Sequence, residues 1–229
     1  MRGNRRPDRD IRARGEGGRA VSLEVDLLAR NDALAGRNRR WLGEHGVRAL
    51  NLMSSPGSGK TTLLERTIRE LAGSRTCAVL EGDQETLLDA DRITATGARV
   101  VQINTGAGCH LDADMVLDGL RALAPEPGSL LFVENVGNLV CPALFDLGES
   151  ARVVIISVTE GTDKPLKYPH MFRTADLMIV NKIDLLPHVD FDVARCVEYA
   201  RRARPGIEVL EVSATRGDGL DAWYRWLAR

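Results

Sequence analysis

The stretch NLMSSPGSGKTTLLERTI, residues 51–68, decides the fold of this chain. An apolar run meets a turn of serine, proline and glycine, followed by Gly-Lys-Thr and by a segment with a helical pattern. In a strand–loop–helix unit of this kind, successive backbone N–H groups and the positive end of the helix point at one place, where an anion binds. The stretch therefore predicts a phosphate-binding loop.

The loop matches the nucleotide-binding signature G-x-x-x-x-G-K-[ST] except at its first glycine, where Ser54 stands. Gly57 and Gly59 still free the backbone to curl around phosphates. Lys60 is expected to reach the terminal phosphates, and the hydroxyl of Thr61 to ligate Mg²⁺. A glycine-rich turn without a ligand is the alternative, but it gives no reason for the intact Gly-Lys-Thr-Thr. We expect a nucleoside triphosphate at this loop.

Outward from the loop, short apolar runs alternate with helical segments. Several runs, such as VVIISV and LMIV, are apolar throughout or almost so, which is typical of strands covered on both faces. Alternating strands and helices with right-handed crossovers build a doubly wound, mostly parallel α/β sheet with helices on both faces, as in P-loop NTPases. The expected strands are 49–55, 76–82, 98–104, 129–134, 152–158, 176–181 and 207–213.

The composition is that of an ordinary globular protein, because 44% of the 229 residues are hydrophobic and 28% are charged. A net charge of −1 gives no electrostatic reason to expect nucleic acid or a membrane as a partner. No apolar run approaches the ~18 residues that suit a bilayer, and the arginine-rich start lacks the apolar core of a secretory signal. Four scattered cysteines favour a reducing compartment, so a cytoplasmic protein is expected.

Three parts are expected along the chain. Residues 1–19 are rich in arginine and nearly devoid of apolar side chains, which predicts a disordered tail. Residues 20–46 mix leucine and valine with charges at helical spacing, and Gly46 is a plausible stop. Residues 47–229 then form the nucleotide-binding domain.

The sequence VNKID, at the end of an expected strand, indicates which base is bound. The carboxylate of Asp184 can accept two hydrogen bonds from the N1–H and N2–H₂ edge of guanine, whereas adenine would leave it unpaired. Asn181 and Lys182 complete the N-K-x-D element, and Ser213 and Ala214 end the next strand where a second loop would close over the base. The order along the chain is that of guanine-nucleotide proteins, so the nucleotide is expected to be GTP.

The segment FVENVGN is expected to sense the γ-phosphate. Glu134 and Gly137 occupy the acid and the glycine of a D-x-x-G-type element, in which the acid approaches Mg²⁺. Asp83, after the second strand, is the other candidate for Mg²⁺ or for the attacking water. Signalling GTPases carry glutamine after that glycine, but this chain has Asn138, so slow intrinsic hydrolysis is expected.

Cys109 and His110 are adjacent and are expected to open a helix, and Cys141 lies beyond Glu134. Thiolate and imidazole ligands suit Zn²⁺ or Ni²⁺, and three of them leave one coordination position open. Spacing alone leaves the alternative that these cysteines are small buried hydrophobic residues. Cys77 and Cys196 fit that second interpretation.

Six motifs together resemble the HypB family of hydrogenase nickel-incorporation GTPases, which are SIMIBI-class P-loop proteins related to the urease GTPase UreG. The motifs are SSPGSGKTTLLE, LEGDQET, QINTGAGCHLDADM, ENVGNLVCP, VTEGTDKPLKYP and NKIDLL. The similarity extends from about residue 20 to the last residue. The Cys-His pair and ENVGNLVCP are not shared by GTPases in general, which makes the resemblance specific.

The resemblance implies a GTPase that dimerises with GTP and delivers nickel to [NiFe] hydrogenase, together with a nickel-binding accessory protein and the hydrogenase large-subunit precursor. It implies a Ni²⁺ or Zn²⁺ site made by Cys109, His110 and Cys141, with Thr61, Asp83 and Glu134 at Mg²⁺. Lys60, Thr61, Asp83 and Glu134 would carry catalysis. The nucleotide would be held by Ser55, Pro56, Gly57, Ser58, Gly59, Lys60, Thr61, Thr62, Gly137, Asn181, Lys182, Asp184, Ser213 and Ala214.

The chain also departs from parts of the family pattern. Some members begin with a cysteine-rich nickel motif or carry a histidine-rich tract, and the arginine-rich start here has neither, so strong nickel binding by that segment is not expected. The nearest alternative is the urease-type GTPase, whose Cys-Pro-His triplet is replaced here by Cys141-Pro142-Ala143. A small-molecule kinase has little use for N-K-x-D, a translational or signalling GTPase none for the cysteine–histidine pair, and four histidines are too few for metal storage.

Two further expectations concern regulation. Lys164 and Lys167 are candidates for a GTP-dependent dimer interface, with solvated surface lysines as the alternative. Cys141 follows Gly137 on one short segment, and Cys109 with His110 follows what is expected to be the adjacent strand. Nucleotide state is therefore expected to change metal affinity, and metal to change nucleotide affinity by the same factor.

Overall fold

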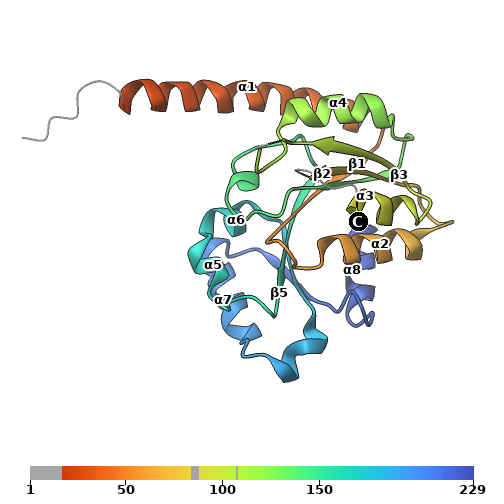
Figure 1. The fold of residues 1–229 in the computed structure, drawn as a ribbon, viewed down its shortest axis with the longest axis vertical. Helices are drawn as coiled ribbons and strands as arrows, with labels where there is room; N and C mark the ends of the chain where they lie inside the picture. Colours follow the sequence, from red (N-terminus) through yellow and green to blue (C-terminus); the bar gives the residue numbers. More distant parts are fainter. Residues whose placement is uncertain (1–16, 84–87, 107) are drawn as a thin grey trace, which may run out of the picture.

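A computed structural model of the chain describes residues 17–83, 88–106 and 108–229, and its centre is a seven-stranded parallel sheet (Figure 1). The strand order is β3-β2-β4-β1-β5-β6-β7. The expected doubly wound sheet is confirmed, and the largest difference is in β7, which ends at Glu211 rather than at residue 213. The strands are β1 (Arg48–Ser54), β2 (Cys77–Asp83), β3 (Arg99–Asn104), β4 (Leu130–Glu134), β5 (Ala151–Ser157), β6 (Leu177–Asn181) and β7 (Glu208–Glu211).

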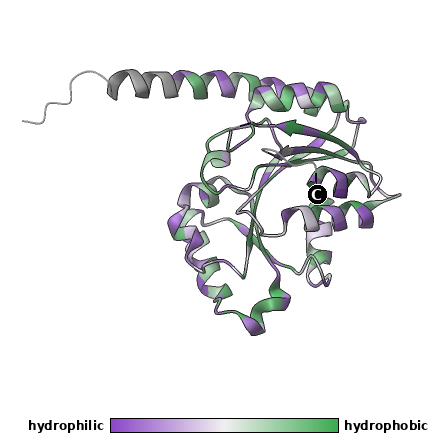
Figure 2. Cartoon of the chain, viewed as in Figure 1, coloured by the Kyte–Doolittle hydropathy of each residue, from purple (hydrophilic) through white to green (hydrophobic). Residues whose placement is uncertain are grey.

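The central strands are buried on both faces, which explains their apolar runs. Every residue of β4 and β6 is buried, as expected for parallel strands covered by helices on each side. Figure 2 shows that hydrophobic residues are concentrated in the strands, while the helices mix hydrophilic and hydrophobic residues.

One face of the sheet is covered by α2 (Lys60–Leu71), α3 (Leu88–Thr94) and α8 (Leu220–Leu227). The other face has two separate covers. Over the β2 side lie α4 (Ala113–Leu123) and α1, and over the β5 and β6 side lie α5 (Lys164–Lys167), α6 (Pro169–Thr174) and α7 (Val193–Ala203). Two short 3₁₀ helices, Cys141–Ala143 and Ile183–His188, follow β4 and β6.

The first described element is α1 (Gly17–Glu44), which packs against α4 with its second half (Figure 1). Its first half projects beyond the domain in this view. The disordered tail expected over residues 1–19 lies outside the described residues except for its last three positions, which belong to this helix. Within the part of the chain that the structure describes, no helix is both long enough and apolar enough to cross a membrane.

Two local expectations were wrong. Cys109 and His110 do not open a helix, because α4 begins at Ala113. Its N-cap is Asp112, whose side chain accepts a hydrogen bond from the Met115 N–H at 2.8 Å and so ends the preceding loop there. In addition, the strand before Cys109 is β3, which is separated from β4 by β2, so the two metal-ligand segments do not follow neighbouring strands.

Candidate nucleotide and metal sites

A cavity of about 520 Å³ opens at the carboxyl ends of β1, β2 and β4, where β1 continues into the phosphate loop. In an open parallel sheet this is the edge at which ligands bind. The cavity is lined by the expected residues Ser55, Pro56, Gly57, Ser58, Gly59, Lys60, Thr61, Thr62, Asp83, Gly137 and Lys182, and also by Ser54, Glu81, Gly82, Asp89, Arg92, Asn135 and Val136.

The loop has the backbone that a phosphate cradle requires. Gly57 and Gly59 adopt φ values of 73° and 90°, which other residues rarely adopt. A Cβ on Gly59 would also lie 2.5 Å from the Asn181 side-chain nitrogen. Ser54 replaces the first signature glycine without strain because it is the last residue of β1 and has ordinary strand geometry.

Lys60 and Thr61 both contact Glu134 in this structure. The Lys60 ammonium lies 2.9 Å from Glu134 Oε1, and the Thr61 hydroxyl donates to the same oxygen at 2.5 Å. Glu134 is 1% exposed, so this ion pair is shielded from water. The three side chains expected to handle the terminal phosphates and Mg²⁺ are therefore within reach of one another.

Glu81 is a residue that the sequence interpretation missed. It stands opposite Glu134 in the register of β2 and β4, and it shares a face of β2 with Asp83. Burial, with the charges of Glu134 and Asp83, raises the pKa of Glu81 to about 8. Oε2 of Glu81 and Oε2 of Glu134 are buried without a hydrogen-bond partner among the described residues. Carboxylates with free oxygens beside a threonine hydroxyl are a donor set that suits Mg²⁺.

The residues of the N-K-x-D element and of the following loop form a second cluster. Ser213 donates its hydroxyl to Asp184 at 2.6 Å, which holds the carboxylate at its position. Asn181 donates to the Ser58 carbonyl at 2.9 Å and accepts from the Ala214 N–H at 3.1 Å. Lys182 adopts φ 64° and donates to the Gly57 carbonyl at 2.7 Å. The base and phosphate loops are thus tied together directly.

Asn138 was expected to stand where signalling GTPases carry a water-orienting glutamine. Its amide instead donates to the Cys109 carbonyl at 3.3 Å and accepts from the Val140 N–H at 2.8 Å. It lines a neighbouring recess rather than the nucleotide cavity. Gly137 lies against the phosphate loop, since a Cβ there would be 3.1 Å from the Pro56 nitrogen.

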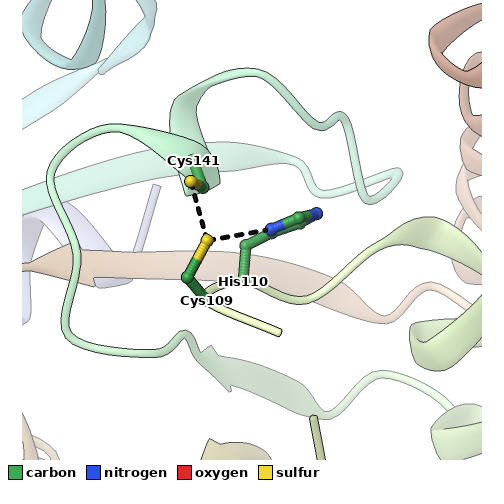
Figure 3. A group of neighbouring side chains, drawn as sticks. All are labelled: Cys109, His110 and Cys141. Atoms are coloured by element: carbon green, nitrogen blue, oxygen red, sulfur yellow. Dashed lines mark hydrogen bonds between the residues drawn. The ribbon is translucent and has the colours of Figure 1, made fainter. Parts of the chain in front are cut away.

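Cys109 and His110, from the loop before α4, meet Cys141, the first residue of the short helix Cys141–Ala143 (Figure 3), with their candidate ligand atoms within 4.8 Å of one another. The two sulfurs are 2.7 Å apart, and the Cys109 sulfur is 3.7 Å from His110 Nδ1. All three side chains are partly exposed. A metal held there could still accept a ligand from another molecule, which distinguishes the group from a closed structural site with four protein ligands.

The surroundings of the cluster suit metal binding. The imidazole of His110 stacks on Phe145, with ring centroids 4.0 Å apart. Burial lowers the pKa of His110 and so favours the neutral form that ligates metals. The hydrogen bond that the Cys109 thiol donates to Cys141, together with burial, raises the pKa of Cys109, so a metal must displace protons from the thiols when it binds.

Comparison with known proteins places the chain in a family. Residues 48–211 match the model described as the CobW/HypB/UreG nucleotide-binding domain. The hydrogenase maturation factor HypB of Rhizobium leguminosarum bv. viciae is 60% identical over 209 residues, which are 91% of this chain and 70% of that protein. The chain belongs to the HypB family of hydrogenase maturation factors. It is accordingly a P-loop GTPase of the HypB type.

Two solved HypB structures share the fold. HypB from Archaeoglobus fulgidus is 41% identical, with a TM-score of 0.82, and covers 88% of this chain and 98% of its own. HypB from Helicobacter pylori in complex with nickel is 38% identical, with a TM-score of 0.83, and covers 87% of this chain and 94% of its own. The expected resemblance to HypB is confirmed.

Besides Glu81, the structure brings Arg92 and Asn135 to the HypB nucleotide cavity. Arg92 donates to Glu65 at 2.9 Å and to Thr62 at 3.1 Å. Asn135 is fully buried; its oxygen accepts from the Leu111 N–H at 3.1 Å, and its nitrogen donates to Asn51 at 3.2 Å. The only sequence signal for Asn135 was its place beside Glu134, since its partners are distant along the chain.

Proposed function

We propose that this protein is a GTP-hydrolysing nickel metallochaperone that holds Ni²⁺ between Cys109, His110 and Cys141 and delivers it during [NiFe] hydrogenase maturation. The observation that carries the proposal is the convergence of three soft ligands within 4.8 Å, on loops that adjoin the nucleotide cavity. The relationship to a HypB solved in complex with nickel supports the choice of metal. Zn²⁺ fits the same ligands and serves as a second probe.

The nucleotide assignment rests on the position of Asp184. The hydrogen bond from the Ser213 hydroxyl holds the Asp184 carboxylate beside the loop that begins at Ala214. In that position the carboxylate would accept hydrogen bonds from the two donors on the guanine edge. Its oxygens would be left unpaired against adenine, which is a strong rejection. The protein is therefore proposed to bind GTP and GDP in preference to ATP.

Thr61, Asp83, Glu134 and Glu81 are proposed to hold Mg²⁺ with the nucleotide. When bound, Mg²⁺ neutralises charge that develops on the phosphate oxygens during transfer. The ion pair between Lys60 and Glu134 shows that the ammonium already lies beside these carboxylates. The Asn138 amide is directed to Cys109 rather than to the cavity, which supports the proposal that it does not orient the attacking water and that intrinsic hydrolysis is slow.

Nucleotide and metal are proposed to be coupled through the segment between Glu134 and Cys141. Asn135 bonds to the N–H of Leu111, the residue after His110, and Asn138 bonds to the carbonyl of Cys109. Leu111 also packs on Gly82, where a Cβ would lie 2.8 Å from the leucine side chain. A movement of Gly137 toward a γ-phosphate would thus be transmitted to all three metal ligands, even though β3 and β4 are not neighbours.

We further propose that GTP favours a homodimer and that the metal passes to a nickel-binding accessory protein or to the hydrogenase large-subunit precursor. The partly exposed metal cluster permits such a transfer. Lys164 lines a recess of about 370 Å³ together with Pro56, Gly137 and Val140, next to both sites. Free thiols as ligands require a reducing compartment, which supports a cytoplasmic location.

The test is a titration of Ni²⁺ and Zn²⁺ into the GDP form and into the form bound to a non-hydrolysable GTP analogue. We expect one metal per subunit, with affinities that differ between the two states by about 5–150-fold. Cys109→Ala and Cys141→Ala should abolish binding, whereas Cys196→Ala, at a buried core cysteine, should not. Equal affinities in both nucleotide states would refute the coupling, and full binding by the two cysteine variants would refute the ligand assignment.

A urease-type role is the alternative function. The urease family places its histidine directly after Cys-Pro, but this chain has Ala143 there, and the histidine of the cluster comes from the other loop as His110. The ligand set therefore favours the hydrogenase role.

A further inference from the structure

Two asparagines of α1, Asn31 and Asn38, are buried two turns apart on one face of the helix, with exposed fractions of 5% and 0%. Burial of a primary amide is unfavourable unless its polar atoms are hydrogen-bonded, and all of them except Oδ1 of Asn38 have partners among the described residues. Their partners therefore indicate what this face of the helix does.

Each asparagine bonds to the same two distant segments. Asn31 accepts from the Ala113 N–H at 2.9 Å and donates to the Asp146 carbonyl at 2.8 Å. Asn38 donates to the Ala113 carbonyl at 2.8 Å and to the Leu147 carbonyl at 3.0 Å. These two side chains, here called the α1 clasp, thus join the start of α4 to the loop that precedes β5.

The two segments joined by the clasp are those that carry the metal ligands. Ala113 follows shortly after Cys109 and His110, and Asp146 follows the short helix that begins at Cys141. Phe145, which stacks on the His110 ring, directly precedes Asp146. The clasp therefore bonds to the backbone on both sides of the gap across which the metal would be held.

The contact between α1 and the second segment is also close. Gly148 has φ 90°, and a Cβ there would lie 2.6 Å from the Ala35 carbonyl oxygen and 2.7 Å from the Asn38 side chain. Arg39 adds an ion pair to Asp146 at 2.7 Å. The backbone at Gly148 packs directly on α1, so a displacement of α1 would also displace the segment that precedes β5.

We propose that α1 sets the geometry of the metal site, with Asn31 and Asn38 as positioning residues that fix the Cys109–His110 loop relative to Cys141. The inference rests on the proposed metal site. It implies that loosening α1 lowers metal affinity while the nucleotide cavity, whose loops the clasp does not contact, keeps its affinity. The alternative is that the two amides only attach α1 to the domain.

The test compares wild type with Asn31→Ala, Asn38→Ala and Asn31→Asp, and with Arg37→Ala as a control at an exposed position of the same helix. Asn31→Asp keeps the acceptor for Ala113 but loses the donor to Asp146. Ni²⁺ affinity and the thiolate charge-transfer absorption of bound Co²⁺ are measured together with GDP affinity. Residues that orient metal ligands typically change affinity by about 10–100-fold.

We expect each asparagine variant to lose about tenfold or more in Ni²⁺ affinity and to shift the Co²⁺ absorption, with the GDP affinity of the metal-free protein unchanged. Ni²⁺ affinity equal to that of wild type, in variants that still bind GDP, would overturn the proposal. If the alanine variants do not fold, Asn31→Asp decides the question. Failure of wild type itself to bind Ni²⁺ would instead refute the proposed metal site, so the two failures are distinguishable.

Discussion

At the scale of single residues, Glu81 is the most informative side chain. It is 3% exposed and stands opposite Glu134, so two carboxylates share one dry position at the end of β2 and β4. A buried pair of like charges is unfavourable unless a proton or a cation neutralises it. Lys60 already pairs with Glu134, so the second carboxylate, Glu81, is expected to hold a proton in the nucleotide-free protein without Mg²⁺.

This gives a pH-dependent prediction for the nucleotide-free protein with Mg²⁺ chelated. The pKa of Glu81 is about 8 in the folded chain and about 4.3 in an unfolded one. Between these values the folded state holds one more proton, so the free energy of unfolding should fall as pH rises. Glu81→Gln should flatten that dependence and raise the melting temperature at about pH 8.5, whereas Glu70→Gln, at an exposed position, should not. An unchanged pH slope in Glu81→Gln would contradict the assignment.

Asp184 carries the second prediction at this scale. Asp184→Asn keeps an acceptor for the Ser213 hydroxyl but offers guanine one donor in place of an acceptor, so affinity for GDP should fall by about 100-fold. Affinity for xanthosine diphosphate should rise, because its C2 carbonyl accepts from the new amide. Competition against a fluorescent nucleotide measures both effects, with Asp190→Asn as an exposed control. Equal affinity of the wild type for ATP and GTP would refute the assignment of Asp184 as the residue that selects guanine.

At the scale of elements, two glycines distinguish the cost of backbone strain from the cost of a steric clash between elements. Gly73 and Gly148 both have positive φ, at 81° and 90°, but only Gly148 has atoms within 4 Å of where a Cβ would lie. Gly73→Ala should cost about 1 kcal/mol from backbone strain alone. Gly148→Ala should cost about 3 kcal/mol or more, because it also forces α1 away from the loop before β5. Urea denaturation of both variants measures the free energy of unfolding. Equal losses of stability would mean that α1 moves away from the loop before β5 at no energetic cost.

The elements also show what the sequence could predict. Apolar runs bounded by turn residues were enough to place all seven strands, because parallel strands buried on both faces have few alternatives. The phosphate loop was recognisable from its local motif, whereas the Cys109, His110 and Cys141 set was expected only through the resemblance to HypB, because spacing alone left buried cysteines as an alternative. Glu81 was not recognisable, because a single glutamate in an apolar strand indicates a site only once its partner on the neighbouring strand is known. Asn31 and Asn38 were not singled out from the sequence either, because their partners lie far away along the chain.

At the scale of the whole molecule, the two lysines expected at a dimer interface separate into different environments. Lys164 pairs with Glu160 at 3.3 Å and borders the recess beside the phosphate loop, whereas Lys167 pairs with Asp163 at 2.8 Å, with 61% of its side chain exposed. Lys164→Ala should therefore reduce the GTP-dependent dimer, and Lys167→Ala should leave it nearly unchanged.

Light scattering with GDP and with a non-hydrolysable GTP analogue measures the dimer. Wild type should change from monomer to dimer mass only with the analogue. Identical monomer mass in both states would exclude nucleotide-driven association, and equal effects of the two lysine substitutions would remove the distinction between them.

The side chain of Asn181 has a consequence for how the two halves of a nucleotide bind. Its amide spans from the Ser58 carbonyl to the Ala214 N–H, so the loop that meets phosphate and the loop that meets the base are ordered together rather than in turn. Because the two loops are joined, binding of either half of the nucleotide is expected to order the site of the other half. Guanosine and pyrophosphate, offered as separate fragments, should therefore enhance each other's binding.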